Sequence, residues 1–316
     1  MFTLAKTLKA RGVLGLNRRN AEYTLWYNSR VLYPLVDDKL TTKRLAEQAG
    51  IAVPKLYGVI EIERQIRTLP HLLQPYQDFV IKPAQGSGGD GIIVISGRRK
   101  ERYRNINGQL IGQDELDHHV SNILSGLYSL GGYQDKALIE YRVQFDPIFA
   151  PISFQGVPDI RIIVFLGVPV MAMVRLPTKM SDGKANLHQG AIGAGIDLAT
   201  GKTLSAVWNN EIITEHPDTE TPVQGVQIPA WDTLLSIAAR SYELTGLGYQ
   251  GVDLVLDENK GPLILELNAR PGLNIQIANQ TGLLSRLKQV EQWRGALITL
   301  DQRIAFAKEH FGPLSI

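Results

Sequence analysis

Two apolar segments near residue 260 most narrowly limit what this chain can fold into. Residues 251–256 and 262–268 are rich in leucine and valine, which is typical of buried strands. Residues 257–261, which join them, are polar and end in glycine, as expected for a tight turn. We therefore predict an antiparallel hairpin. Its apolar face is expected to hold Leu254, Leu256, Leu265 and Leu267.

The predicted hairpin carries three oxygen-bearing side chains on its other face. A turn centred between Asn259 and Lys260 pairs Asp253 with Glu266, and Asn268 shares the strand face of Glu266. Two facing carboxylates repel, and burying them among leucines is costly without a cation. A few oxygen ligands suit magnesium that also binds substrate phosphates. We therefore predict a metal site here, with a solvent-exposed polar face as the alternative.

A glycine-rich segment follows another predicted strand. Residues 86–91 match the pattern G-x-G-x-x-G, but β-branched residues 92–95 follow where a Rossmann fold requires a helix. Strands at 79–83 and 91–96 instead make the segment the tip of a hairpin. Glycine lets the backbone approach phosphate oxygens, and Lys82 adds a cation. We predict a phosphate-binding flap; the alternative is a tight turn that simply requires glycine.

The other segments alternate irregularly between helical and strand patterns. Helices are expected at residues 37–50, closed by Gly50, and at 231–245 after Pro229. Further strands are expected at residues 56–60, 138–143, 160–165, 170–176 and 190–196, and a helical tail at 282–310. This irregular order indicates an α+β fold with mixed or antiparallel sheets.

Composition excludes several classes of protein. The chain has no cysteine, which excludes disulfides and thiolate chemistry, and its net charge of +2 does not indicate a nucleic-acid partner. Its longest apolar run, residues 162–174, is too short to cross a bilayer. The basic residues 1–20 are interpreted as a solvated helix, with a transit peptide or membrane-surface helix as alternatives. We expect a cytoplasmic protein without stable membrane insertion and leave a homo-oligomer open.

Taken together and in order, the motifs resemble the ATP-grasp superfamily, specifically its branch related to ribosomal-protein S6 glutamate ligases. The resemblance extends over about residues 37–282. It rests on Asp38 and Lys39, residues 80–83 with the glycine loop, residues 159–161, residues 186–188, and residues 251–253 with 266–272. It implies two α+β subdomains that grip ATP, at residues 77–144 and 145–316. They follow a shortened N-terminal region, residues 1–76, where such ligases usually carry a full α/β domain.

The resemblance also implies roles for individual residues. ATP phosphates would contact Lys39, Lys82, Gly86, Ser87, Gly88, Gly89, Gly91 and Asn186. The hinge beside adenine would consist of Glu140, Tyr141 and Val143. Magnesium, as two ions and with Mn²⁺ as an alternative, would bind Asp253, Glu266 and Asn268. An acyl-phosphate and a tetrahedral intermediate would be stabilised by Arg175, Lys184 and Arg270. Asp159 and Arg161 would contact nucleotide or substrate, or form a structural ion pair.

The implied activity is an ATP-dependent carboxylate–amine ligase that forms ADP, phosphate and an amide through an acyl-phosphate. Its acid and amine would be small molecules or peptides, with an amino acid such as glutamate among them. Alternatives are a D-alanine–D-alanine-type or other ATP-grasp ligase, a non-catalytic nucleotide-binding module, and a membrane-surface protein. Residues 200–227 have no counterpart in the glutamate ligases, and Lys184 stands where the relatives tend to have arginine. His118 and His119 are expected on a helix surface without a metal.

Overall fold

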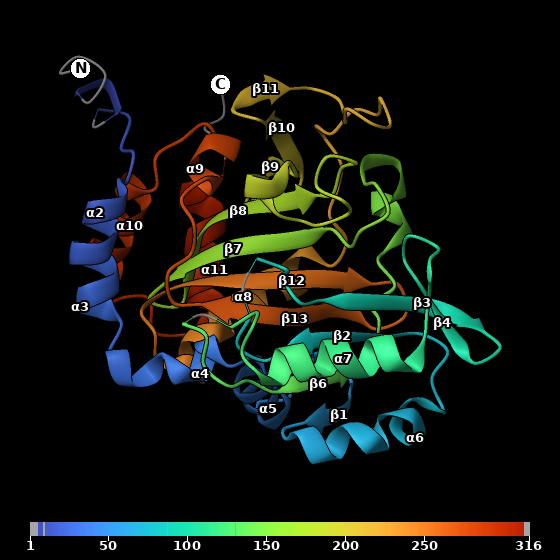
Figure 1. The fold of residues 1–316 in the computed structure, drawn as a ribbon. Helices are drawn as coiled ribbons and strands as arrows, with labels where there is room; N and C mark the ends of the chain where they lie inside the picture. The colour runs from blue at the N-terminus through green and yellow to red at the C-terminus, as the bar shows by residue number, and fades with distance from the viewer. Residues whose placement is uncertain (1–5, 9, 87, 130, 313–316) are drawn as a thin grey trace. The chain divides into compact units, whose positions relative to one another are not determined.

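The computed structural model describes residues 6–8, 10–86, 88–129 and 131–312. The chain divides into two compact units, whose elements are labelled in Figure 1. The smaller unit consists of Asp38–Leu40 and Val53–Gln144. The larger unit takes in the described residues up to Asp37, then Thr41–Ala52 and those from Phe145 onwards.

An antiparallel sheet forms the frame of the smaller unit. Within the described residues it has six strands in the order β1-β6-β2-β3-β4-β5. The strands are β1 (Leu56–Ile60), β2 (Phe79–Pro83), β3 (Ile93–Arg99), β4 (Arg102–Asn105), β5 (Leu110–Ile111) and β6 (Ala137–Glu140). The helices are η3 (Glu63–Thr68), α6 (Leu69–Leu73) and α7 (Gln113–Leu124).

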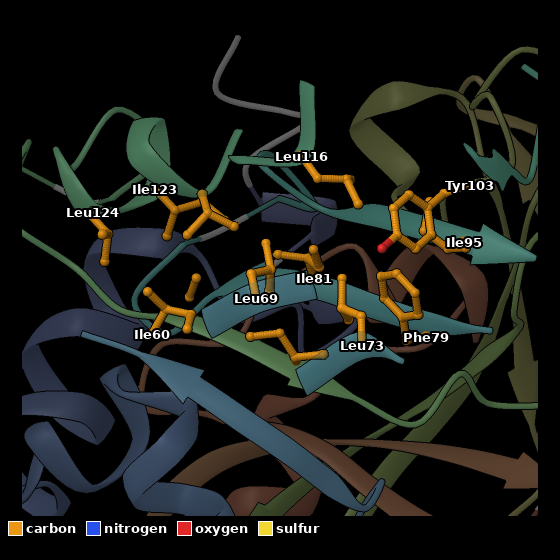
Figure 2. Close-up of a cluster of buried hydrophobic side chains, with 13 residues drawn as sticks. Ile60, Leu69, Leu73, Phe79, Ile81, Ile95, Tyr103, Leu116, Ile123 and Leu124 are labelled. Carbon is orange, nitrogen blue, oxygen red and sulfur yellow. The ribbon is translucent and has the colours of Figure 1, made fainter. Parts of the chain in front are cut away.

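The core of this unit forms where α7 packs against β2. On α7, Leu116, Val120 and Ile123 are fully buried because their spacing places them on one face of the helix. Figure 2 shows Leu116 and Ile123 among the buried side chains that cover the strands, which include Phe79 and Ile81. This core holds β2 in place, and β2 leads directly into the glycine loop.

A second antiparallel sheet forms the frame of the larger unit. Its seven strands in the described part of the chain follow the order β11-β10-β9-β8-β7-β12-β13. They are β7 (Asp159–Phe165), β8 (Val168–Leu176), β9 (Ile192–Ile196), β10 (Thr203–Trp208), β11 (Glu211–Ile213), β12 (Tyr249–Asp257) and β13 (Gly261–Asn268). Every residue of β12 is buried, because this strand lies between β7 and β13 inside the sheet.

Helices lie before, between and after the strands of this sheet in the chain, and several of them pack on it. At the start they are α2 (Leu16–Arg18), η1 (Arg19–Thr24), α3 (Leu25–Tyr27), η2 (Arg30–Leu32), α4 (Pro34–Asp37) and α5 (Lys39–Gln48). Further along the chain are η4 (Pro147–Ile152), η5 (Leu187–Gln189), α8 (Trp231–Thr245), α9 (Ile275–Ala278), α10 (Leu284–Trp293) and α11 (Leu300–Phe311). Helices α8 and α11 contact each other and pack on β7 and β8 (Figure 1).

The predicted α+β fold is confirmed, and all strand pairs in the two sheets are antiparallel. The expected strands at residues 56–60 and 79–83 and the helix at 231–245 have the predicted bounds. The strand expected at residues 138–143 ends earlier, at Glu140. In the described part of the chain, no helix combines the length and the hydrophobicity needed to cross a membrane.

The hairpin near residue 260 has the predicted pairing but a different turn. Asp257 pairs with Gly261, so the turn is centred on Asn259 rather than between Asn259 and Lys260. Asp253 nevertheless lies opposite Glu266, because a β-bulge shifts the register between 253 and 254 by one residue. The same bulge explains a wrong prediction for Leu265, which is only half-buried. The strand kink therefore determines which side chain faces Asp253.

Candidate functional site

Three side chains of the β12–β13 hairpin meet on one face of the larger sheet. The side-chain amide nitrogen of Asn268 lies 3.3 Å from Asp253 Oδ2 and 3.2 Å from Glu266 Oε1, and it donates to both. Asp253 is fully buried, whereas Glu266 and Asn268 are half-buried. The structure thus brings together the three residues that the sequence analysis selected as metal ligands.

Two arginines from neighbouring strands bind the buried carboxylates. Arg161 on β7 donates from Nε to Asp253 Oδ1 at 2.7 Å and from Nη2 to Asp253 Oδ2 at 2.5 Å. Arg175 on β8 donates to Asp253 Oδ2 at 2.8 Å and binds Asp159 through both Nε and Nη2. Asp159 and Arg161 therefore do form ion pairs, but with partners across the sheet rather than with each other. This arrangement corrects the predicted alternative of an Asp159–Arg161 pair.

The pKa values of these groups follow from burial and from the arginines. Burial raises the pKa of Asp159 to about 6, although Arg175 acts in the opposite direction. Burial also raises the pKa of Asp253, but Arg161 and Arg175 outweigh it and hold that pKa well below its usual range. Burial lowers the pKa of Arg175, and the Asp159 and Asp253 carboxylates reverse this and raise it above its ordinary value. Asp253 is consequently a carboxylate throughout the neutral range.

The formal charges of this cluster leave it negative. Three carboxylates (Asp159, Asp253 and Glu266) against two guanidiniums (Arg161 and Arg175) give a formal charge of −1. The prediction assumed that the facing carboxylates required a cation; in the structure the arginines neutralise most of that charge. In the described part of the chain, no group of three or more His, Cys, Asp and Glu side chains is arranged to hold a metal.

The donor set still fits a hard divalent ion when the amide of Asn268 is included. That amide already lies between the carboxylates of Asp253 and Glu266, and its rotation would exchange the nitrogen for an oxygen ligand. Asp253 already accepts hydrogen bonds from both arginines, whereas the half-buried Glu266 is more accessible. Glu266 is therefore the ligand to which a cation has the easiest access.

Lys184 and Asn186 lie in a separate loop, residues 177–190, between β8 and β9. The side-chain oxygen of Asn186 accepts from the backbone N–H of His188 at 3.0 Å and caps the short helix η5. Lys184 is half-buried, and its backbone N–H donates to Ser181. The loop is closed internally by Thr178, whose hydroxyl donates to the carbonyl of Gly190. Both predicted residues thus lie in the turn that joins β8 to β9.

Residues 200–227, which the sequence analysis left unassigned, hold this loop in position. The ring of His216 is fully buried, and its Nε2 lies 3.0 Å from the carbonyl oxygen of Pro177. Asp218 accepts from the backbone N–H of Lys179 at 2.7 Å, and Trp208 donates to the carbonyl of Gly190 at 2.8 Å. Strand β10 and the turn after β11 therefore support both ends of the loop.

Arg270 occupies a different environment from the other predicted catalytic cations. It is exposed, and its guanidinium lies 5.0 Å from the ring centroid of Tyr33. The bend that contains it follows β13 and packs closely on β12, where a Cβ at Gly251 would lie 2.7 Å from Pro271 Cβ. Glycine at 251 is thus required by the close approach of the bend.

The smaller unit holds the predicted lysines and the glycine loop. Lys39 donates from Nζ to the carbonyl of Gly86 at 2.5 Å, so the lysine lies at the first residue of the loop. Lys82 and Glu140, on neighbouring strands, form a buried ion pair. The loop turns through left-handed conformations at Gly88, Gly89 and Gly91, with φ values of +67°, +83° and +73°. Ser87, predicted as part of the loop, lies outside the described residues.

Sequence reasoning missed two side chains that anchor the loop. Buried Asp135 accepts from the backbone N–H of Gln85 at 3.0 Å and from the hydroxyl of Ser129 at 2.6 Å. His119, on α7, has its Nε2 2.9 Å from the carbonyl oxygen of Gly91, and burial lowers the pKa of His119. Both histidines lie on α7 as predicted, with His118 exposed on its surface, but His119 is half-buried against the loop.

The predicted adenine hinge follows β6. Glu140 is the last residue of that strand and binds Lys82. The backbone N–H of Tyr141 donates to the carbonyl of Lys55 at 2.8 Å, and Val143 is buried. The Tyr141 N–H is therefore already engaged in the structure, and the adenine contact at this hinge stays a prediction.

A family model matches a part of the chain that contains both the glycine loop and the carboxylate cluster. The model, described as sugar-transfer associated ATP-grasp, matches residues 18–292. The chain belongs to the sugar-transfer associated ATP-grasp family. The predicted resemblance to the ATP-grasp superfamily is thereby confirmed.

Curated relatives of this ATP-grasp protein are named as probable alpha-L-glutamate ligases. The one from Ectopseudomonas mendocina (strain ymp) is 24% identical over 238 residues, which cover 75% of this chain and 56% of that protein. The one from Maridesulfovibrio salexigens is 30% identical over 122 residues, or 39% of this chain and 29% of that protein. The chain thus spans about half the length of the relative from Ectopseudomonas mendocina.

Solved structures are similar at lower identity. The ATP-grasp ligase PsnB in complex with minimal precursor, Mg and ADP is 14% identical, with 88% of this chain and 62% of that chain covered and a TM-score of 0.47. The D-cycloserine synthetase DcsG is 13% identical, with 86% and 74% covered and a TM-score of 0.47. Both TM-scores are below 0.5, so the family assignment rests on the sequence match.

Proposed function

We propose that this ATP-grasp protein is a magnesium- and ATP-dependent carboxylate–amine ligase. One observation carries the proposal: Asn268 bridges Asp253 and Glu266, so three oxygen-bearing side chains meet at one point of a cluster with a formal charge of −1. Such a cluster suits a hard divalent ion that is shared with phosphates. The magnesium, when bound, would withdraw charge from the phosphates of ATP.

The chain's own residues then have distinct tasks. Lys39, Lys82 and the glycine loop bind phosphate oxygens through two cations and backbone N–H groups. Arg161 and Arg175 fix the orientation of Asp253, which keeps the metal ligands in place before nucleotide binds. Lys184 and Arg270 are the proposed cations for the negative charge that develops on the acyl group.

The proposed reaction has two steps. A carboxylate oxygen of the acid attacks the γ-phosphorus of ATP, the bond to the β-phosphate oxygen breaks, and ADP leaves. The amine then attacks the acyl carbon of the resulting acyl-phosphate, phosphate leaves, and the amine loses a proton to phosphate or solvent. The names of the relatives support glutamate as one substrate of this chain.

Hydroxylamine offers a test that does not depend on knowing the amine, because it traps acyl-phosphates as hydroxamates. The protein is incubated with Mg-ATP, hydroxylamine and a panel of acids that includes glutamate, D-alanine and short peptides. We expect hydroxamate and ADP in equal amounts with one class of acid. Glu266→Gln should abolish both, whereas Glu258→Gln, in the exposed turn of the same hairpin, should abolish neither.

The panel also separates the rival functions. Hydroxamate formed from D-alanine but not from glutamate would favour a D-alanine–D-alanine-type ligase. Nucleotide binding without ADP formation for any acid would contradict the ligase proposal and indicate a binding module. Absence of nucleotide binding would overturn the assignment of both sets of residues.

A further inference from the structure

The N-terminal helices of the larger unit carry apolar side chains both towards the sheet and towards solvent, and the fold explains only those that point towards the sheet. On the inner face, Tyr23 packs edge-on against Phe165 with ring centroids 5.5 Å apart, and Tyr27 does the same at 4.8 Å. On the outer face, Trp26 is 76% exposed and Val31 is 78% exposed. A tryptophan this exposed is unusual for the surface of a soluble protein.

Four residues make up this outer apolar surface, which we call the Trp26 surface. They lie within sixteen residues of chain on α2 and α3, which Figure 1 labels, and on η2, and each is more than half exposed: Leu16, Leu25, Trp26 and Val31. Their neighbours Tyr23 and Asn28 are buried, and the amide of Asn28 is bonded to the carbonyls of Tyr249 and Ala269. The segment is therefore fixed to the sheet from within, and its outer side chains are held towards solvent.

Charge in the same stretch is strongly positive. Residues 1–36 contain six Lys and Arg against one Glu, a net charge of +5, whereas the other 280 residues contain 27 basic and 30 acidic side chains, a net charge of −3. Arg19 is buried and Arg18 pairs with Glu22 at 2.6 Å. Lys6, Arg11 and Arg30 are exposed, so they offer charge to an external partner.

We infer that the Trp26 surface docks on the face of an anionic lipid bilayer. An exposed tryptophan among aliphatic side chains, with the exposed Arg30 in the same segment and the exposed Lys6 and Arg11 shortly before it, suits the boundary between headgroups and acyl chains. The negative headgroups of anionic lipids attract the positively charged N-terminal residues. Each basic residue near the membrane strengthens binding roughly fivefold. The inference is independent of the proposed ligase activity, because none of these residues belongs to the glycine loop or to the carboxylate cluster.

Vesicle co-sedimentation tests the inference. The whole protein is mixed with vesicles of phosphatidylcholine alone and of phosphatidylcholine with phosphatidylglycerol. We expect sedimentation with the anionic vesicles only, and release as salt rises, because surface charges are screened. Trp26→Ala should weaken this binding by about tenfold, since it removes the largest exposed apolar side chain. The double variant Arg11→Glu and Arg30→Glu should abolish it.

A matched control variant and a folding check separate a specific loss of vesicle binding from unfolding. Ile212→Ala removes an apolar side chain that is 62% exposed on β11 and should bind vesicles as the wild type does. Unchanged thermal unfolding of each variant shows that the fold is intact. A wild-type protein that stays in solution with both vesicle types would overturn the lipid assignment in favour of a protein partner. Equal binding by wild type and Trp26→Ala would overturn the role of this surface.

Discussion

The carboxylate cluster of the larger unit and the glycine loop of the smaller unit hold charge in contrasting ways. In the larger unit, Asp159, Asp253, Arg161 and Arg175 form ion pairs between three adjacent strands, in the interior of a sheet. In the smaller unit, the cation Lys39 lies at a loop of glycines whose backbone is anchored by single side chains from elsewhere. The first arrangement is rigid and fixes directions before a ligand arrives. The second leaves backbone N–H groups in a loop whose conformation depends on a few separate hydrogen bonds.

We expect the largest loss of stability from a substitution of Asp253, the most buried carboxylate of the cluster. Asp253→Asn removes the fully buried carboxylate that Arg161 and Arg175 share, and breaking a buried pair costs about 3–5 kcal/mol of unfolding free energy. Urea denaturation measures this loss. Glu266→Gln, at a half-buried position, should cost less than about 1 kcal/mol. Similar losses of unfolding free energy in the two variants would contradict the view that Asp253 is a structural carboxylate and Glu266 an accessible one.

A substitution of Gly91 tests whether the glycine loop tolerates a change in its backbone conformation and packing. Alanine there must adopt a φ of +73°, which costs about 1–2 kcal/mol, and its Cβ would lie 2.5 Å from the Tyr128 ring, which adds about 1–3 kcal/mol of overpacking. Gly50→Ala is the matched control, because its φ is +66° but nothing lies within 4 Å. The melting temperature of Gly91→Ala should be well below that of Gly50→Ala. Equal melting temperatures would show that the loop yields to the added methyl group.

Asp135 tests whether side chains anchor the loop. Asp135→Asn weakens charged hydrogen bonds from the Gln85 N–H and the Ser129 hydroxyl, at a cost of about 1.5–3 kcal/mol. Ser129→Ala removes only one of these contacts and should cost less. Hydrogen exchange of the amides from 85 to 91 should accelerate in Asp135→Asn. Unchanged exchange would indicate that the glycines hold their conformation without this anchor.

The smallest expected effect is the pH dependence due to His119. Burial lowers its pKa in the folded protein below the ordinary 6.5, with His118 adding to this and the Gly91 carbonyl opposing it. Between 6.5 and the lower folded value the unfolded chain binds more protons, so stability falls as pH drops through this interval. The contribution of His119 to the unfolding free energy of the wild type should therefore decline below pH 6.5, while Asp159, whose pKa is raised to about 6, acts in the opposite direction in the wild type and in a His119 variant. His119→Gln should flatten that decline, and an unchanged slope would contradict the assignment.

Prediction from sequence succeeded where local pattern determines structure. The polar turn and the flanking leucines correctly predicted the hairpin, and Asp253 pairs with Glu266 as predicted. The bulge at Leu265 was not predictable, because it compensates for a turn one residue shorter than assumed. Likewise, the β-branched residues after the glycine loop correctly indicated a strand, β3, in place of a Rossmann helix.

Contacts between distant residues escaped the sequence analysis. Arg175 binds Asp159 and Asp253 because β8, β7 and β12 are adjacent, and hydrophobic periodicity does not specify strand order. His119 binds the carbonyl of Gly91, 28 residues away, and Asp135 binds Gln85, 50 residues away, each through a single hydrogen-bonding side chain with no local motif. The position of His119 follows from the packing of α7 on β2, whereas Asp135 lies just before β6, the strand that pairs with β2.

Calorimetric titration of ATP, with and without magnesium, tests the central claim most directly. The account predicts that magnesium tightens ATP binding by the wild type and by Glu258→Gln. In Glu266→Gln, ATP alone should bind as before, but magnesium should tighten binding at least about tenfold less. Equal tightening by magnesium in Glu266→Gln and in the wild type would contradict the assignment of the hairpin carboxylates as the metal site.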